Sequence, residues 1–531
     1  MNSQSMQSGP QAEIARGIAE GNELLRQHRP ADAVALGQQL AGRYPDVAAI
    51  RAFLAEASRL ASDLPAAIGH IDRAIALSDD PQHRIKKGWL LSRAYRRDEA
   101  IALAGELSAQ AGGNALLLWQ LGKLYYHHNQ LLQAISHYER ALALEERTPW
   151  RYDLAVARFY AAQTEAAEQD IGKLLAAAPQ SGSVLYLRST LRKQTPADNH
   201  VEDLRARLAQ GFARTEDEAC ALYALAKELE DLGEHAESFA KLMAGARKRR
   251  STLNYDPSGF YATLDEIKRL ATPEAMAAPV EGWEEEGAIF VLGLPRTGTT
   301  LAERMLLQSG KVANAGELTD FGYLLGNGVA RVMASNPGLS VAEASLQLDF
   351  ATLGREYMRG ARQLAGGSPL FIDKLPANFM YCGVISKALP RARIIHLVRD
   401  PLDSCYAILK TLFFGAYEFS YDLEELADYY IAYRRLMDHW HQVLPGQILD
   451  VRYEDLVTDP EGQSRRIYEW CGLEWTPEAV EVPDAGKVFA TASAAQVRQP
   501  VHSRSVRSSR RHLEGLAPLV ARLKAAGLYE D

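Results

Sequence analysis

The chain has 531 residues, which is too many for one ordinary domain, so two or three domains are expected. Its hydrophobic content of 47% and charged content of 24% are typical of a soluble globular protein. The net charge of −8 argues against general nucleic-acid binding, and no apolar run is long enough for a membrane span.

The N-terminus lacks the basic start and apolar core of a signal peptide. Four widely spaced cysteines form neither a metal-ligand pattern nor a disulfide framework: Cys220, Cys382, Cys405 and Cys471. We therefore expect a cytoplasmic protein whose cysteines pack as small hydrophobic side chains.

Residues 12–250 carry apolar side chains at helical spacing and contain few strand-like segments. In the clearest unit, Leu118, Gly122 and Tyr125 share one face of a helix, and Ala134 and Tyr138 share a face of the next helix. The pattern recurs, more weakly, at about 34 residues, which is the tetratricopeptide spacing. It predicts an α-helical solenoid of tetratricopeptide type, with a non-repetitive helical bundle as the alternative. Because solenoids offer long concave surfaces, a protein partner or a homodimer contact is expected there.

The basic run Arg247–Arg250 is expected to be a solvated helix end, and residues 251–285 are expected to connect two domains. Between residues 286 and 531, short apolar stretches alternate with helical segments. This alternation predicts an α/β domain with a mainly parallel sheet. The expected strands cover residues 288–294, 370–373, 393–398 and 447–451. Ligands of such sheets bind at the carboxyl ends of the strands.

A glycine loop follows the first of these strands. The spacing from Gly293 to Gly298 fits a phosphate-binding loop, but Thr299 replaces the lysine that a nucleoside-triphosphate site needs. We therefore expect this loop and the helix after it to bind one phosphate, or a phosphate joined to another acid group. An ordinary strand–turn–helix without a ligand is the alternative. The expected contacts come from Pro295, Arg296, Thr297, Gly298, Thr299 and Thr300.

A second anion contact is expected where the strand at 393–398 ends. Arg399 is placed to bind another phosphate, with a structural ion pair as its alternative. A helix is predicted to begin after Asp400-Pro401, because aspartate caps helices and proline suits their first turn. Ser404 is either a hydroxyl donor to the ligand or a plain helix serine. His396, inside the strand, is expected to be a packed core histidine.

Together, the segments PRTGTT (295–300) and VRDP (398–401) resemble the sulfotransferase family, whose donor is 3′-phosphoadenosine 5′-phosphosulfate (PAPS). Five further segments add to the resemblance: Gly316–Glu317, Phe371–Pro376, Arg452–Leu456, Thr491–Ser493 and Gln496–Pro500. Their order resembles that of tyrosylprotein sulfotransferases. It is more closely similar to the bacterial proteins that join tetratricopeptide repeats to a sulfotransferase domain.

The resemblance implies a P-loop-like domain and assigns roles to residues at the matching positions. Glu317 would be the general base, and Lys374 and Arg296 would stabilise the transferring sulfuryl group. The 5′-phosphosulfate would lie on the first loop and the 3′-phosphate on Arg399. The rest of the nucleotide site would include Ser404, Tyr453, Ser493 and Arg498. No metal is expected, because side chains and backbone can stabilise the leaving group.

Each of these side chains also has a structural alternative. Glu317 would then be a surface or capping residue, Lys374 a partner of Asp373, and Tyr453 a packed tyrosine; Ser493 and Arg498 would be solvated loop residues. Two departures from the family pattern stand out. Ala407 occupies a position where the family has serine, and the segment 507–511 has arginines but lacks the family's tryptophan.

The sequence thus predicts a sulfotransferase that moves the sulfuryl group of PAPS to an acceptor hydroxyl and leaves adenosine 3′,5′-bisphosphate (PAP). The acceptor is on a protein, with tyrosine as one candidate, or on a sugar or small molecule. Two alternatives are a nucleotide kinase of the P-loop type and a non-catalytic repeat scaffold with a nucleotide-sensing domain.

Overall fold

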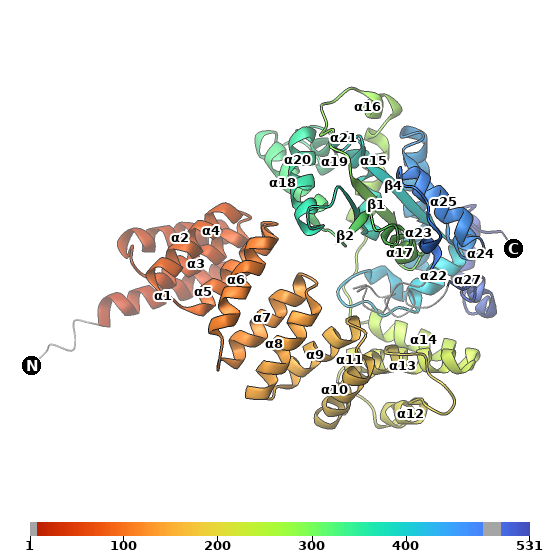
Figure 1. Cartoon of the computed structure of the whole chain (residues 1–531), viewed down its shortest axis with the longest axis horizontal. Coiled ribbons are helices and arrows are strands. Elements are labelled where there is room, and N and C mark those ends of the chain that lie inside the picture. Colours follow the sequence, from red (N-terminus) through yellow and green to blue (C-terminus); the bar gives the residue numbers. More distant parts are fainter. Residues whose placement is uncertain (1–7, 482–500, 531) are drawn as a thin grey trace, which may run out of the picture. The chain divides into compact units, whose positions relative to one another are not determined.

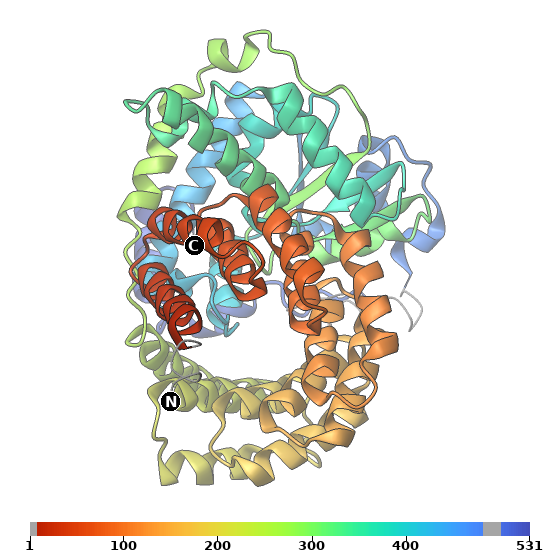
Figure 2. The ribbon, with the colours of Figure 1, turned by 90° about the vertical axis from the view of Figure 1, so that its left-hand side faces the viewer.

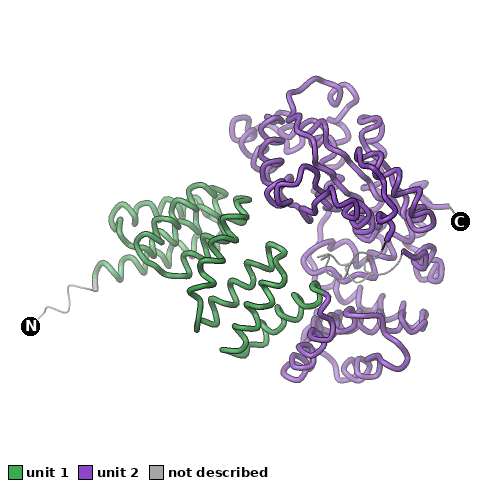
Figure 3. The backbone as a smooth tube through the Cα atoms, viewed as in Figure 1, with its two compact units in different colours: residues 1–161 green, residues 162–531 purple. Residues whose placement is uncertain are grey.

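The computed structural model describes residues 8–481 and 501–530. The chain consists of two compact units, residues 1–161 and residues 162–531 (Figure 3). Among the described residues, no helix combines the length and apolar character that a bilayer crossing needs.

The first unit is built from antiparallel helical hairpins that stack side by side (Figures 1 and 2). In one such pair, the helices of Gly122 and Tyr138 pack so closely that only glycine fits at position 122. A Cβ atom there would lie 2.5 Å from the ring of Tyr138. The predicted faces are confirmed: Leu118, Leu121 and Ala134 are fully buried. The helices of this unit are α1 (Ser8–Arg26), α2 (Pro30–Arg43), α3 (Ala48–Leu60), α4 (Leu64–Leu77), α5 (Pro81–Arg93), α6 (Arg97–Gln110), α7 (Ala115–His127), α8 (Leu131–Leu144) and α9 (Thr148–Tyr160).

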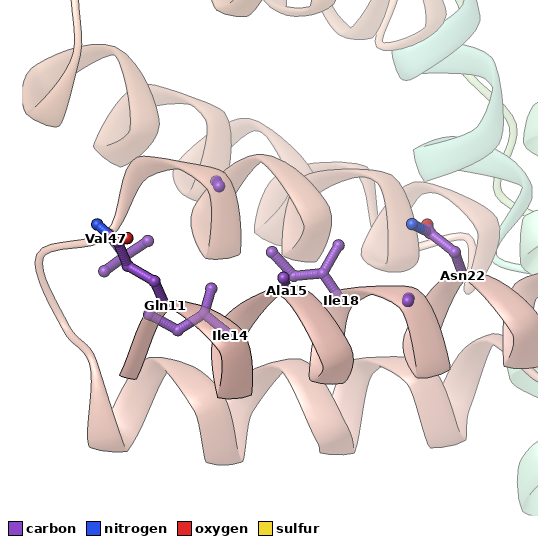
Figure 4. Close-up of a pocket in the computed structure, with 8 residues that line it drawn as sticks. Gln11, Ile14, Ala15, Ile18, Asn22 and Val47 are labelled. Atoms are coloured by element: carbon purple, nitrogen blue, oxygen red, sulfur yellow. The ribbon is translucent and has the colours of Figure 1, made fainter. Parts of the chain in front are cut away.

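An open cavity of about 630 Å³ lies along α1 in this unit (Figure 4). Ile14, Ala15 and Ile18 of α1 face Val47 and Ala49 at the start of α3, so its lining is mostly apolar. The cavity contains none of the predicted site residues.

Helical hairpins continue into the second unit, and the last of their helices ends at Arg250. They are α10 (Thr164–Ala177), α11 (Gly182–Thr190), α12 (Val201–Gln210), α13 (Thr215–Leu232) and α14 (His235–Arg250). Their apolar residues share one core with the α/β part: Cys220, Tyr223, Ala226, Leu242 and Ala246 belong to it. The compact unit therefore begins inside the predicted solenoid rather than at residue 286. The predicted connector contains two helices, α15 (Ser258–Leu270) and α16 (Pro273–Ala277).

The basic run at the end of α14 is only partly solvated. Arg250 forms a two-pronged ion pair with Glu425 at 2.7 Å, and Lys248 pairs with Glu218. This corrects the expectation of a purely solvated helix end: a guanidinium at the last turn fixes the hairpin to the α/β part of the same unit.

The α/β part contains one five-stranded parallel sheet in the order β2-β3-β1-β4-β5. The four predicted strands are present as β1 (Ala288–Gly293), β3 (Leu370–Asp373), β4 (Arg393–Val398) and β5 (Ile448–Arg452). The sequence interpretation missed the edge strand β2 (Val312–Gly316), whose small residues lack the branched, apolar pattern of a strand.

Successive residues of β1 point to opposite faces of the sheet. Phe290 joins the core on one face, together with α18 and α20–α23, whereas Val291 packs on the other against α17 and α25. The α-helices of this part are α17 (Thr299–Leu307), α18 (Asp320–Ser335), α19 (Val341–Ser345), α20 (Phe350–Leu364), α21 (Cys382–Ala388), α22 (Pro401–Leu409), α23 (Leu423–Val443), α24 (Tyr453–Thr458), α25 (Pro460–Trp470) and α27 (Ala517–Ala525). Short 3₁₀ helices are η1 (Pro376–Tyr381), η2 (Glu418–Tyr421), η3 (Pro477–Val480) and η4 (Ser508–His512). All four cysteines are buried and free, as expected.

Candidate active site

The glycine loop connects β1 to α17 in a tightly turned conformation. Gly293, Arg296 and Gly298 have φ values of 141°, 70° and 100°, so three of six residues adopt the left-handed region. A Cβ atom at Gly293 would lie 2.6 Å from the carbonyl oxygen of Leu397, so only glycine fits there. The hydroxyl of Thr297 donates to the Leu294 carbonyl at 2.7 Å and thereby stabilises the turn itself. The N-terminus of α17 directs backbone N–H groups into this loop, as an anion site requires.

Arg399 at the end of β4 lies against this loop. It is 6% exposed; its Nη1 donates to the Arg296 carbonyl at 2.9 Å and its Nη2 to the Ser505 carbonyl at 2.8 Å. Its guanidinium stacks on the ring of Tyr453, 4.6 Å from the centroid, and the Tyr453 hydroxyl lies 2.6 Å from the Ser505 hydroxyl. The same ring covers Gly298, where a Cβ atom would come within 2.7 Å of it. The structure thus joins three predicted residues to Ser505, which the sequence interpretation missed.

The two arginines give this side of the site a strong positive potential. Burial, and next the nearby charge of Arg399, lower the pKa of Arg296. Two cations that destabilise each other in a buried place favour an anion between or beside them.

Glu317 and Lys374 meet on the other side of the loop, after β2 and β3. The ammonium of Lys374, which is 2% exposed, donates to the carboxylate of Glu317, which is 45% exposed. Asp373 takes no part in this pair, because its carboxylate accepts from the hydroxyl of Tyr357 at 2.7 Å and the backbone N–H of Leu318 at 3.3 Å. The predicted alternative, a Lys374–Asp373 pair, is therefore not the one observed.

The turn that carries Glu317 is fixed on several sides. The register of β2 on β3 shifts between Asn314 and Gly316, and Gly316 has a φ of 101°. The side chain of Asn314 accepts from the Gly316 N–H at 2.7 Å, and the Lys374 N–H donates to the Gly316 carbonyl at 3.0 Å. These contacts direct the Glu317 side chain toward Lys374.

Strand order places all these groups in one row. Along the carboxyl edge of the sheet, from β2 to β5, lie Glu317, Lys374, the glycine loop, Arg399 and Tyr453. Neighbouring strands are about 4.8 Å apart, so the row brings together residues that are up to 160 positions apart in the sequence (453 − 293). An acid–base group stands at one end of the row and a cationic, aromatic site at the other.

The remaining predicted residues that the structure describes do not lie in this row. Ser404 is fully buried, and its hydroxyl is directed at the Arg399 carbonyl at 3.4 Å. The predicted start of α22 is confirmed, with Pro401 in the first turn and the Asp400 side chain accepting from the Asp403 N–H at 2.9 Å. Ser493 and Arg498 lie outside the described residues.

The C-terminal arginine segment is fastened to the start of α22. The carboxylate of Asp403 accepts from the backbone N–H groups of Arg507 and Ser509, and from the Ser509 hydroxyl at 2.6 Å. The segment 507–511 therefore lies at the same end of the sheet as Arg399.

Helix α11 contributes a side chain that no motif indicated. The hydroxyl of Tyr186 accepts from the Leu412 N–H at 3.2 Å, and burial raises the pKa of Tyr186 to about 12 although the charge of Arg296 opposes this. In the segment after Leu412, burial and the charge of Glu317 raise the pKa of Tyr417 to about 12.

His396 is buried in the core, as expected, and takes part in a polar cluster. Its Nδ1 lies 2.8 Å from the Asp450 carboxylate, which also binds His441 Nε2 at 2.9 Å, and its Nε2 contacts the hydroxyl of Tyr433. These atoms are close enough for a metal ion. Hydrogen bonds already satisfy them, so we interpret the cluster as a link between β4, β5 and α23.

Residues 288–477 match the family model described as "Sulfotransferase family". A protein of Aquifex aeolicus is 30% identical over 332 residues, which cover 61% of this chain and 44% of that protein. The omega-hydroxy-beta-dihydromenaquinone-9 sulfotransferase of Mycobacterium bovis is 36% identical over 110 residues, or 19% of this chain and 28% of that enzyme. Protein-tyrosine sulfotransferase 1 of Danio rerio is 25% identical over 294 residues, or 50% of this chain and 78% of that enzyme. The chain thus spans less than half the length of the first two.

Proposed function

We propose that the chain is a sulfotransferase, in keeping with the family model that matches residues 288–477, and that it transfers the sulfuryl group of PAPS to an acceptor hydroxyl. The single observation that supports this most is the row along the sheet edge. It presents a carboxylate beside a buried lysine at one end, an anion loop in the middle and an arginine on a tyrosine ring at the other.

The donor fits the charges of this row. The backbone N–H groups of the loop, with Arg296, Thr299 and Thr300, would hold the phosphosulfate. Arg399 and Tyr453 would hold the 3′-phosphate side of the nucleotide, closed over by Ser493 and Arg498. The missing loop lysine suits a phosphosulfate better than a triphosphate, which needs a lysine and a magnesium ligand.

Glu317 would act as the general base and take the proton of the acceptor hydroxyl. The acceptor oxygen then bonds to sulfur while the bond from sulfur to the leaving phosphate oxygen breaks. Lys374 and Arg296 would stabilise the negative charge that develops on the sulfuryl and bridging oxygens. The Lys374–Glu317 ion pair holds the two side chains next to each other, and the proposal includes no metal.

The acceptor and the partners are the finer part of the proposal. A protein tyrosine is the first acceptor to test, because a tyrosine sulfotransferase is among the relatives; hydroxyls of sugars and small molecules come next. The helical hairpins would bind the acceptor protein or a second copy of the chain, in the cytoplasm.

The first experiment titrates the purified chain with PAP and, separately, with ADP and with ATP plus magnesium. We expect saturable PAP binding that weakens at least about tenfold in Arg399→Ala, because one buried charge-assisted phosphate contact is lost. Arg355→Ala, which removes an exposed arginine of α20, is the matched control. Binding of magnesium–ATP but not PAP would overturn the proposal in favour of a kinase.

The second experiment measures transfer from PAPS. We expect Glu317→Gln to lower turnover by about 10²–10⁴-fold with little change in PAP affinity, which is the usual contribution of a general base. Unchanged turnover would reject Glu317 as the base. Normal PAP affinity without transfer to any acceptor, by the unmodified chain, would instead indicate a non-catalytic nucleotide sensor.

A further inference from the structure

The peptide groups on both sides of Glu317 are held by two residues at the end of β3. The Gly316 carbonyl, just before Glu317, accepts from the Lys374 N–H at 3.0 Å. The Leu318 N–H, just after Glu317, donates to Oδ1 of the Asp373 side chain at 3.3 Å. One backbone group and one side chain thus fix the turn at the position of the proposed base.

The carboxyl group that holds Leu318 is itself fixed. Asp373 is fully buried, and its Oδ2 accepts from the hydroxyl of Tyr357 in α20 at 2.7 Å. The Tyr357 ring packs against Phe290 of β1 and Phe321 of α18, with centroid distances of 5.5 and 5.4 Å. Because these rings belong to a close-packed core, the hydroxyl has little freedom to move away from the carboxyl group.

A buried acid at this place does not serve stability alone. Burial raises the pKa of Asp373 to about 7, although the hydrogen bonds from Tyr357 and Leu318 lower it. The cost of burial is therefore only partly offset by these contacts. What the acid does provide is geometry, since its two oxygens join α20 to the turn after β2.

That turn has few other supports. Strand β2 is at the edge of the sheet, with β3 as its neighbour, and its register shifts just before Glu317. The side chains above the turn are the reacting ones, because the ammonium of Lys374 donates to the carboxylate of Glu317. A change in the hydrogen bonds at Asp373 would therefore move the base.

We propose that Asp373 is a positioning residue for the sulfuryl transfer. Its carboxyl group joins the Tyr357 hydroxyl to the Leu318 N–H, and so holds Glu317 where it can take the proton of the acceptor hydroxyl. Because Asp373 is fully buried, it acts through Glu317 and not on the substrates themselves. This inference rests on the proposed function, which makes Glu317 the base.

Two substitutions at residue 373 separate hydrogen bonding from charge. Asp373→Ala removes both contacts, whereas Asp373→Asn keeps an oxygen for the Leu318 N–H and an amide for the Tyr357 oxygen. We expect turnover of PAPS to fall about 10²-fold in Asp373→Ala and to return to within about fivefold of the unmodified chain in Asp373→Asn. The KM for PAPS and the PAP affinity should stay within about threefold in both, since only the placement of the base changes.

Tyr357→Phe is an independent variant, and it also serves if Asp373→Ala does not fold. It removes the hydroxyl that orients the carboxyl group and keeps the ring, so turnover should fall about two- to tenfold. Tyr468→Phe is the matched control, because it removes another buried hydroxyl, which donates to the Met305 carbonyl at 2.7 Å. It should lower the unfolding temperature to a similar degree and leave turnover unchanged.

Hydrogen exchange reports the position of the turn without turnover. The backbone N–H of Leu318 should exchange at least about tenfold faster in Asp373→Ala than in the unmodified chain, because it loses its acceptor. In Asp373→Asn it should remain protected. Mass spectrometry of peptides that contain Leu318 measures both rates.

The possible results separate the two proposals. Suppose that PAP binds and transfer occurs. The role of Asp373 is then rejected if Asp373→Ala keeps full turnover, if Asp373→Asn is as slow as Asp373→Ala, or if Tyr468→Phe loses as much turnover as Tyr357→Phe; the proposed function stands. If the unmodified chain neither binds PAP nor transfers the sulfuryl group, the proposed function fails and this inference fails with it.

Discussion

Helical hairpins of one kind occur on both sides of residue 161, but they bury different surfaces. In the hairpin of α7 and α8, Gly122 lets the Tyr138 ring pack between two neighbouring helices. In the hairpin of α13 and α14, Tyr223 belongs to the core of the α/β part and its hydroxyl donates to the Leu409 carbonyl at 3.0 Å. Helical periodicity therefore shows which two helices form a hairpin. It does not show what the outer face of that hairpin packs against, because this depends on the whole fold.

The two units also bury different ionisable groups. In the first, burial lowers the pKa of His128 to about 4. In the second, burial raises the pKa of Glu303, Asp320 and Asp373 to about 7 each. The physical cause is the same, since burial penalises the charged form, but the sign of the shift is opposite for a base and an acid.

Truncation tests whether the hairpins after residue 161 are part of the core of the α/β part, and it should give the largest change in stability of the variants considered. We expect residues 162–531 to fold and to bind PAP with a Kd within about threefold of the full chain, because they form one compact unit. Residues 251–531 should aggregate or unfold at much lower temperature. They lose the core side chains of α13 and α14, each of which contributes about 1.5–3 kcal/mol when it is a large apolar group. Soluble expression, thermal unfolding and PAP titration report the outcome. Equal stability of the two fragments would show that the hairpins are dispensable.

The pH dependence of unfolding tests the second contrast. The folded pKa of Glu303 lies above its unfolded value of 4.5, so its contribution to stability is present below pH 4.5 and is lost as the pH rises through 7. Glu303→Gln should therefore stabilise the second unit at pH 8 relative to pH 5, by up to about 3 kcal/mol.

His128 should behave in the opposite way. Its folded pKa lies below its unfolded value of 6.5, so the folded state loses stability as the pH falls from 6.5 toward 4. His128→Gln should destabilise the first unit less at pH 5 than at pH 8. Denaturant unfolding of both variants at the two pH values measures this, and shifts of the same sign would contradict the contrast.

A single hydroxyl provides the smallest and most local test. Tyr223→Phe should lower the unfolding free energy by about 1–2 kcal/mol, because the buried Leu409 carbonyl loses its donor while the ring still fills its place. Tyr357→Phe, which removes a buried tyrosine hydroxyl from Asp373 instead, tests the same unit away from the hairpins. An unchanged free energy in Tyr223→Phe would mean that the hydroxyl does not hold α13 to α22.

Much of the fold was accessible from the sequence, because its signals are local. Buried parallel strands such as 288–293 are continuous apolar runs, and Asp400-Pro401 marks a helix start wherever it lies. Strand β2 was missed because Val312-Ala-Asn-Ala-Gly316 has no such run and pairs only with β3. Its backbone pairing with β3 identifies it as a strand, and that pairing is visible only in the folded sheet.

The residues of the candidate site also fall into two groups, those that the sequence could predict and those that it could not. The loop, Arg399 and Tyr453 follow strands, so their meeting could be expected from parallel topology alone. Ser505 contributes its carbonyl and a hydroxyl contact, and Tyr186 comes from a helix 226 positions before Leu412; neither has a sequence signal of its own. Glu303 had a weak signal, a lone acid on the apolar face of a helix, and only the folded structure shows that it is buried.

The strand order also bears on how such an enzyme changes its specificity. Glu317 follows the edge strand β2, whereas the residues proposed to bind the nucleotide follow β1, β4 and β5. In the proposed function, the parts that would face the acceptor and the donor lie toward separate ends of one sheet, and the chain that follows Glu317 up to β3, residues 318–369, forms an uninterrupted insert. If the proposed function holds, exchange of that insert is a route by which evolution or an engineer could redirect the transfer to a new hydroxyl while the base and the donor site are kept.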